Sequence, residues 1–168
     1  MILIVAGVAG SGKSTIGVLL ARGLGWPFAD ADGFHPEANI AKMRAGIPLT
    51  DADREPWLRA VCDWMDAKIA AGQSAVVTCS ALKRAYRDEL LAGRPTATMV
   101  YLEVSKDVLV RRLASRQDHF FREDLLNSQL ADFEPPATDE RVLRVLEEDG
   151  AERTVAQIIA MLFRGRTA

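Results

Sequence analysis

Residues Gly7 to Ser14 read Gly-Val-Ala-Gly-Ser-Gly-Lys-Ser, a spacing of glycine, lysine and serine that can hold phosphate groups. This is the P-loop pattern, in which a glycine-rich turn precedes a lysine and a hydroxyl residue. The glycines let the chain turn tightly, so that successive backbone N–H groups and a helix N-terminus face one anion. The Lys13 amine should reach the β- and γ-phosphates of a nucleotide, and the Ser14 hydroxyl should bind Mg²⁺. The pattern therefore predicts a nucleoside-triphosphate site.

The sequence on both sides of the motif supports this interpretation. The run Ile2–Ala6 is typical of a buried parallel strand, and Ile16, Leu20 and Leu24 follow at helical spacing. The alternative is a glycine-rich turn with an incidental lysine, but such a string arises by chance in on the order of one chain in two hundred of this length. The residues of this segment expected to bind nucleotide are Gly7, Val8, Ala9, Gly10, Ser11, Gly12, Lys13, Ser14 and Thr15.

Strand-like runs alternate with helical patterns along the whole chain. Further strands are expected at residues 28–30, 75–79, 98–102 and 142–146, with amphipathic helical patterns between them. We expect one α/β domain over residues 1–168, a five-stranded parallel sheet flanked by helices on both faces. Ligands of such sheets bind beyond the carboxyl ends of the strands, so functional residues should follow the strands.

Two carboxylates, Asp30 and Asp32, follow the second expected strand with one residue between them. Side chains with that spacing at a strand end point the same way, here toward the P-loop. One carboxylate can help to hold hydrated Mg²⁺, and the other can accept the proton of a hydroxyl that attacks the γ-phosphate. We assign Asp30 to the metal and Asp32 to the proton, because Asp32 is nearer the acceptor segment. A simple Asx-turn at Asp32 is the structural alternative.

Basic residues downstream of this pair favour a pocket for a polar, anionic acceptor. They are Lys42 and Arg54, and His35 belongs with them if it contacts ligand. His35 could equally begin a helix and pack on Phe34.

A basic segment also follows the third expected strand, where Ser80 begins the string Ser-Ala-Leu-Lys-Arg-Ala-Tyr-Arg. Lys and Arg here suit a phosphate or an anionic acceptor, although a solvated basic helix face is a common alternative. The position at a strand end favours function for Lys83 and Arg87, and less so for Arg84.

An arginine pair follows the fourth expected strand. Arg112 and Arg116 lie four residues apart on one helix face and can clamp nucleotide phosphates, as arginine fingers do. The polar segment that follows leads into a short helix at 123–133, and we expect residues of about 117–133 to form a closing lid. His119 could contact the acceptor or pack the lid down.

The bulk composition excludes several classes of protein. The 168 residues carry a net charge of −2, with 49% apolar and 26% charged residues, so no global field favours nucleic acid or an anionic membrane. The apolar runs are too short to cross a bilayer, and a first strand at Ile2 leaves no room for a signal peptide. We expect a cytoplasmic protein in which Cys62 and Cys79 are free core thiols.

Several longer strings are more specific than the P-loop. Asp-Ala-Asp-Gly-Phe-His-Pro occupies residues 30–36, Pro-Leu-Thr-Asp-Ala-Asp-Arg residues 48–54, and Cys-Ser-Ala-Leu-Lys residues 79–83. With the P-loop and residues 129–135, these strings make the chain resemble the gluconokinases, small P-loop kinases related in fold to nucleoside-monophosphate and shikimate kinases. The resemblance spans nearly the whole chain, and Ala9, where many relatives have serine, touches no side-chain role.

The resemblance implies the P-loop NTPase fold and ATP-dependent phosphorylation of D-gluconate at its terminal hydroxyl, giving 6-phospho-D-gluconate and ADP, with Mg²⁺ as the metal. It also suggests a homodimer. The residues expected around gluconate are Asp32, His35, Lys42, Arg54, Ser80, Lys83, Arg87 and His119. Those expected to act directly in catalysis are Lys13, Asp32 and Arg116.

Three alternatives remain at this point. A kinase of the same fold could act on another sugar acid or on a shikimate-like acceptor, although shikimate kinases carry a glycine-rich string where this chain has Ser80 to Lys83. A regulatory GTP switch would need the guanine-reading string Asn-Lys-x-Asp, which is absent from the sequence. A ligand sensor without catalytic activity would be revealed by an assay of ADP release.

Overall fold

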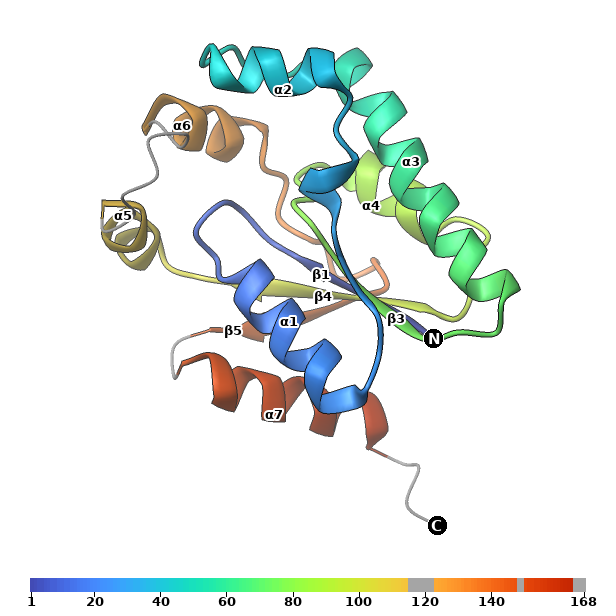
Figure 1. Cartoon of the computed structure of the whole chain (residues 1–168). Helices are drawn as coiled ribbons and strands as arrows, with labels where there is room; N and C mark the ends of the chain where they lie inside the picture. Colours follow the sequence, from blue (N-terminus) through green and yellow to red (C-terminus); the bar gives the residue numbers. More distant parts are fainter. Residues whose placement is uncertain (115–122, 148–149, 165–168) are drawn as a thin grey trace.

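The computed structural model describes residues 1–114, 123–147 and 150–164, and within them a parallel sheet lies between layers of helices (Figure 1). The strands are β1 (Ile2–Ala6), β2 (Phe28–Asp30), β3 (Ala75–Cys79), β4 (Ala97–Glu103) and β5 (Val142–Leu146). They are hydrogen-bonded in parallel in the order β2-β3-β1-β4-β5. Every strand expected from the sequence is therefore confirmed, and β4 extends one residue further at each end.

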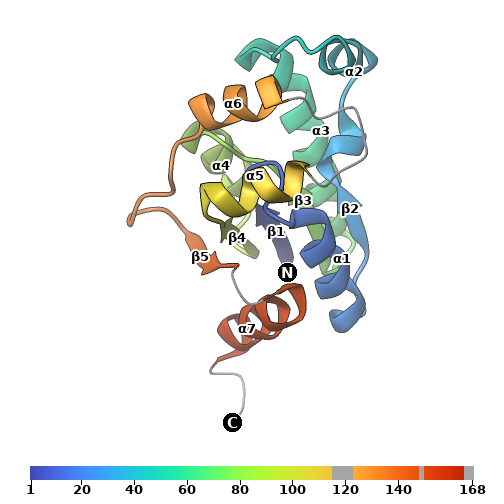
Figure 2. The same ribbon diagram turned by 90° about the vertical axis from the view of Figure 1, so that its left-hand side faces the viewer.

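Helices cover both faces of the sheet, as the alternating pattern predicted. One face packs against α1 (Lys13–Leu24) and α7 (Ala151–Phe163), and the other against α3 (Asp51–Ala70) and α4 (Arg84–Leu91). The other helices described are the short 3₁₀ helix η1 (Ala31–Phe34), α2 (Glu37–Arg44), α5 (Lys106–Ala114) and α6 (Glu123–Asp132). Figure 2 looks toward the carboxyl edge of the sheet, with α5 and α6 in the foreground and α7 at the opposite end of the molecule from α6.

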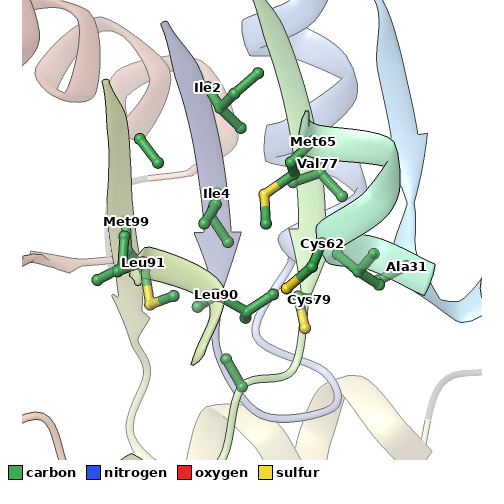
Figure 3. Packing of buried hydrophobic residues seen from close by; sticks show 14 of the residues in the cluster. Ile2, Ile4, Ala31, Cys62, Met65, Val77, Cys79, Leu90, Leu91 and Met99 are labelled. Atoms are coloured by element: carbon green, nitrogen blue, oxygen red, sulfur yellow. The ribbon is translucent and has the colours of Figure 1, made fainter. Parts of the chain in front are cut away.

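The central strand β1 shows why the sequence forms a doubly covered sheet. Its residues are completely buried, because successive side chains of a strand point to opposite faces and both faces carry helices. Ile2 and Ile4 lie in the core beneath α3 and α4, together with Val77 and Met99 (Figure 3). Each such buried aliphatic side chain stabilises the fold by about 1.5–3 kcal/mol.

Close packing of α1 on the sheet depends on Gly17. A Cβ at this position would lie 2.6 Å from the Thr78 methyl group and 2.8 Å from the Phe28 ring. Real Cβ atoms do not approach so closely, so a larger residue would push α1 away from β2 and β3. Because α1 begins at the phosphate loop, this contact helps to set where that loop lies.

The carboxyl ends of three neighbouring strands bring the predicted functional segments to one edge. β1 and β3 end at the paired residues Ala6 and Cys79, and β2 ends at Asp30 beside Thr78. Cys62 and Cys79 are both buried and free, as expected for core thiols. Among the described residues, no helix has the length and apolar character needed to cross a membrane.

Candidate active site

The P-loop joins β1 to α1 and presents the N-terminus of that helix. Gly12 caps α1 in the left-handed region at φ 88°, and no side chain caps the helix or adds a negative charge in its first turn. The N-terminus of this 12-residue helix therefore faces the loop without a capping side chain, and the helix dipole favours an anion there. The Lys13 ammonium donates to the Val8 carbonyl at 2.9 Å, which folds the lysine back along the loop.

The conformation of the loop requires glycine at position 7. Gly7 has φ 150°, and a Cβ there would lie 2.6 Å from the Ser11 hydroxyl oxygen and 3.2 Å from the Leu102 carbonyl oxygen. The Ser11 hydroxyl is itself fully buried, and no hydrogen-bond partner for it is found in the described part of the chain. A buried polar group of this kind at a phosphate loop fits a loop that is completed by its ligand.

Asp30 and Asp32 take different positions at the end of β2. The Ser14 hydroxyl donates to Asp30 Oδ2 at 2.9 Å, and the Asp32 N–H donates to Asp30 Oδ1 at 3.1 Å. The turn expected here is therefore closed by Asp30 and leaves the Asp32 carboxylate facing the cavity. Burial, and then the Asp30 charge, raise the pKa of Asp32, while the Lys13 charge opposes them.

A cavity of about 470 Å³ lies where these segments meet. That volume is in the range of small-molecule sites. Its polar wall includes the P-loop, Asp32, His35, Arg54 and Ser80, all expected at the site. Sequence reasoning assigned no function to the rest of its lining, which is Ile40, Met43, Arg44, Ile47, Pro48, Leu49, Trp57, Leu82, Ser128 and Gln129.

His35 lines this cavity and stacks on Trp57, not on Phe34. The two rings are 4.5 Å apart and inclined by 10°, and the Trp57 indole N–H is held by the Ala31 carbonyl at 2.7 Å. Burial first, and then the charge of Arg54, lower the pKa of His35 to about 4. The imidazole is therefore neutral near pH 7. Its Nδ1 accepts from the Asn39 side-chain amide at 3.3 Å, which leaves the Nε2–H as a donor toward a hydroxylated ligand.

Arg54 reaches the cavity from α3 and is held by acidic and phenolic oxygens. Its Nη1 lies 3.0 Å from Asp132 Oδ2 on α6, 3.7 Å from Asp51 Oδ1 and 3.3 Å from the Tyr86 hydroxyl. The residue is 9% exposed, so this guanidinium is a largely desolvated positive charge at the cavity wall. It can recognise a carboxylate in two-pronged geometry.

Lys42 and Lys83 are not part of the cavity lining, and each forms an ion pair. The Lys42 ammonium contacts Asp53 at 2.6 Å, and Asp53 also closes the capping box of α3 with Thr50. The Lys83 ammonium contacts Asp51 at 2.7 Å, and the Tyr86 hydroxyl donates to the same carboxylate. Neither lysine lines the cavity, so direct substrate contact for either remains a prediction.

The substrate role predicted for Arg87 is wrong in this structure. Its side chain is completely buried and pairs with Glu140 through contacts of 2.6 and 2.9 Å. Its Nη1 donates to the carbonyls of Ala81, Leu82 and Glu134. With its donors turned into the protein, Arg87 supports the backbone after β3, where Ala81 has the strained φ of 43°.

Arg112 lies beside the P-loop, as the clamp hypothesis requires. Its Nη1 is 3.8 Å from where a Cβ of Gly12 would stand, and its Nη2 is 2.5 Å from Glu147, a buried carboxylate that follows β5. Arg116 and His119 lie outside the described residues, as does the first part of the predicted lid.

Two residues without a predicted chemical role, Ser128 and Gln129, enter the site from α6. The Gln129 Oε1 accepts a hydrogen bond from the Ala9 N–H at 3.0 Å, so α6 touches the P-loop directly. Residues 129–135 belonged to the family resemblance, which was the available signal, but an amide and a hydroxyl on a helix carry no charge pattern that would assign them chemistry.

The fold and the site together define a P-loop kinase of the small-molecule type. The shikimate kinase family model matches residues 9–162. A gluconokinase of Gluconobacter oxydans is 45% identical over 94% of this chain and 88% of its own length. The chain belongs to the gluconokinase family.

Two solved structures are similar to this one. An unliganded sugar kinase from a Janibacter species is 43% identical with a TM-score of 0.89, covering 96% of this chain and 93% of that one. A gluconokinase from Sinorhizobium meliloti is 37% identical with a TM-score of 0.81, covering 99% of this chain and 97% of that one.

Proposed function

We propose that this protein is an ATP-dependent gluconokinase, which transfers the γ-phosphoryl group of ATP to the terminal hydroxyl of D-gluconate. The products are 6-phospho-D-gluconate and ADP. The observation that carries the proposal is one cavity that joins the P-loop, the Asp32 carboxylate and the Arg54 guanidinium. A phosphate cradle, a proton acceptor and a carboxylate receptor are what transfer to a sugar acid needs, and the names of the similar proteins agree with that substrate.

The triphosphate would bind at the start of α1. Uncapped N–H groups of the first turn and the Lys13 ammonium supply positive potential to the β- and γ-phosphates. Arg112, held by Glu147 beside Gly12, would add a second positive charge. We keep Arg116 as the proposed partner of Arg112 in this clamp. Since the transferring group carries its charge on its outer oxygens, fixed positive groups stabilise the transition state more than the bound substrate.

The residues present fit Mg²⁺ held between protein and phosphates. Ser14 and Asp30 offer oxygen ligands within hydrogen-bond distance of each other, and no group of three or more His, Cys, Asp or Glu suited to a metal is found among the described residues. In kinases, Mg²⁺ is typically held by one or two protein oxygen ligands together with substrate phosphates and water. It would neutralise phosphate charge, and Ser14 and Asp30 would hold it.

Asp32 would receive the proton of the attacking hydroxyl. Its carboxylate faces the cavity, and its backbone is fixed by the hydrogen bond to Asp30. Desolvation by the surrounding protein, and then the Asp30 charge, raise the pKa of Asp32, which makes its carboxylate a stronger base than an isolated aspartate in water. Arg54 would bind the carboxylate of the sugar acid, with His35 and Ser80 as hydrogen-bonding groups for its hydroxyls. Lys42 and Lys83 would contribute to acceptor binding indirectly, through their ion pairs with Asp53 and Asp51.

Turnover with a panel of acceptors tests this proposal. Purified protein would be given ATP and Mg²⁺ with D-gluconate, other aldonates, shikimate or the neutral polyol sorbitol, and ADP release would be followed. We expect gluconate to give the highest kcat/KM and ³¹P NMR to show a phosphate monoester on its terminal carbon. A clear preference for shikimate, or no ADP release with any acceptor, would overturn the assignment.

We further propose that the chain acts as one kinase domain over residues 1–168, within a homodimer, as the family resemblance implies. Two free buried thiols are compatible with a reducing cytoplasm, where we place the enzyme. Light scattering coupled to size exclusion would measure the oligomeric state directly.

A further inference from the structure

Gln129 joins α6 to the P-loop at the point where the two substrates should meet. Its Oε1 lies 3.0 Å from the Ala9 nitrogen, although the two residues are 120 positions apart in the sequence. Gln129 and its neighbour Ser128 both line the cavity that holds Asp32 and Lys13. Figures 1 and 2 both place α6 on the carboxyl side of the sheet, toward which the P-loop also projects.

The chemistry of the carboxamide decides which end faces a ligand. A glutamine side chain has an acceptor oxygen and an amino group with two donors. Because the Ala9 N–H is a donor, the oxygen must face it, and the network therefore assigns the amino group to the other side. No hydrogen bond of this Nε2 is found in the described residues. An amino group at the wall of this cavity is a donor for the oxygen of a bound molecule.

The corner of the loop that Gln129 contacts is also the corner that Lys13 contacts. The Lys13 ammonium donates to the carbonyl of Val8, and the Gln129 oxygen accepts from the next residue, Ala9. In P-loop kinases this lysine contacts the β- and γ-phosphates of the bound nucleotide. A terminal phosphate bound at this corner would therefore lie near the Gln129 amide, on the side where α6 contacts the loop.

We propose that Gln129 is a catalytic residue, whose Nε2 donates a hydrogen bond to an oxygen of the transferring phosphoryl group while its Oε1 is anchored on Ala9. This role rests on the proposed function, because it requires a γ-phosphate at the P-loop. The anchor restricts the amide to one orientation, so the donor is in place before the reaction. Donors fixed in that way stabilise the charge that spreads over the phosphoryl oxygens in the transition state.

Two substitutions separate this role from a structural one. Gln129→Glu keeps the length and the oxygen that accepts from Ala9, but it has no amino group and adds negative charge. Gln129→Met has neither donor nor acceptor and adds no charge. If Gln129 only anchored the loop, activity would fall in the Met variant alone. If the added charge were the only cause, activity would fall in the Glu variant alone. Loss in both variants is the result that a missing donor predicts.

The measurements are kcat with gluconate and the affinities for ADP and for β,γ-imido-ATP. We expect kcat to fall roughly 10²-fold in both variants, the size of effect seen when one such donor is removed. Affinity for β,γ-imido-ATP should fall about tenfold while affinity for ADP stays within twofold, because ADP has no γ-phosphate. Gln73→Glu, on the exposed end of α3 beyond Ala70, is the matched control and should change none of these values.

The proposal would be overturned if either variant kept the wild-type ratio of the two affinities together with wild-type kcat. If the wild-type protein does not phosphorylate gluconate, the proposed function fails, but the two affinities still test the Gln129 contact. Equal loss of affinity for ADP and for the imido analogue would also overturn it, since such a loss would show a general distortion of the loop.

Discussion

At the residue scale, the site is a set of charges whose partners decide what each can do. Lys42, Arg54 and Lys83 were all expected to meet the acceptor, and each has an acidic neighbour within 3.0 Å. Arg54 alone of these three lines the cavity. The other two lysines pair with Asp53 and Asp51 and so link α3 to α2 and to the start of α4, and their charges act on the cavity at longer range.

Replacing Lys13 by alanine tests the phosphate cradle. The ammonium should follow the β- and γ-phosphates into the transition state, so its loss should lower kcat/KM by roughly 10²–10³-fold, as for other single electrostatic contacts. The fold should be retained, because the amine lies at the phosphate loop, where it donates to the Val8 carbonyl. Steady-state kinetics and circular dichroism measure the two effects, with Lys68→Ala at the far end of α3 as the control. Near-normal turnover in folded Lys13→Ala protein would contradict the P-loop assignment.

The Asp30 and Asp32 pair makes a prediction about pH. Asp32→Asn should reduce kcat by roughly 10²-fold and leave ATP binding intact, because the hydroxyl loses its proton acceptor. Asp30→Asn should raise the Mg²⁺ requirement. It should also move the acid limb of the kcat profile to lower pH, since the Asp30 charge is one of the causes that raise the pKa of Asp32.

The base must be ionised to work, so activity is lost as pH falls through the pKa of Asp32, and a lower pKa preserves activity to lower pH. Profiles of kcat against pH for the wild type and Asp30→Asn measure this shift. An acid limb that moves to higher pH in Asp30→Asn would contradict the assignment. If Asp30→Asn abolished turnover and Asp32→Asn changed only the Mg²⁺ requirement, the two roles would be reversed.

At the element scale, α6 connects three parts of the site. Gln129 contacts the P-loop, Asp132 contacts Arg54 on α3, and the chain just after the helix pairs with the segment after β3 through Glu134 and Leu82. All three contacts involve groups at the cavity or next to it. We therefore expect α6 to respond to whatever occupies the cavity.

Ligand binding should therefore protect α6. If the segment of about 117–133 closes over substrates, ATP with gluconate should slow amide hydrogen exchange in 123–132 and slow proteolysis of the whole segment. A ligand that prefers the closed state must increase its population. Exchange measured by mass spectrometry in α7, which packs against α1 on the other side of the sheet from α3 and α4, serves as the internal control. Unchanged exchange in α6 at saturating ligand would show that the helix is a fixed wall.

At the scale of the whole molecule, stability and site geometry depend on a buried ion pair. Arg87 on α4 and Glu140 before β5 have side chains that are 0% and 3% exposed. The pair and its carbonyl contacts join α4 to the segments after β3 and after α6. Glu134 strengthens the same junction, because its carboxylate accepts from the first N–H of α4 at 2.7 Å. The segment after β3 includes Ser80 and Leu82, which line the cavity, and the other segment directly follows the helix that carries Ser128 and Gln129.

Glu140→Gln should destabilise the protein by about 3–5 kcal/mol, the cost of leaving a buried charge without its partner. For a chain of this size the melting temperature should fall by roughly 6–20 °C. Asp139→Asn is the control, because it removes an exposed ion pair with Arg84 at the position before Glu140. It should lower the free energy of unfolding by about 1 kcal/mol or less. Thermal unfolding followed by calorimetry measures both.

Pairing with Arg87 lowers the pKa of Glu140, so this stabilisation is present above the ordinary glutamate pKa and is lost as pH falls below it. The difference in the free energy of unfolding between the wild type and Glu140→Gln should therefore become smaller at acidic pH. Equal stability of Glu140→Gln and Asp139→Asn at neutral pH would show that the buried pair contributes no more than the exposed one.

The sequence by itself determined the sheet and the position of the phosphate loop, for a local reason. The run Ile2–Ala6, the glycines after it and the helix from Lys13 are contiguous, so period, turn chemistry and motif act within about twenty residues. The parallel arrangement follows because strands alternate with helices, and it places Asp30 and Ser80 at the same edge as the loop.

The tertiary structure decided which of the polar residues face the cavity. Arg87 and Lys83 lie four residues apart in one basic string, yet Arg87 turns into the core because Glu140, 53 positions away, is placed there by β5. Gln129 reaches the P-loop across 120 positions, although an uncharged amide on a helix carries no local charge pattern that would assign it a role. Ion pairs and hydrogen bonds between distant segments, together with burial, set the direction of a side chain, and neither is encoded in local spacing.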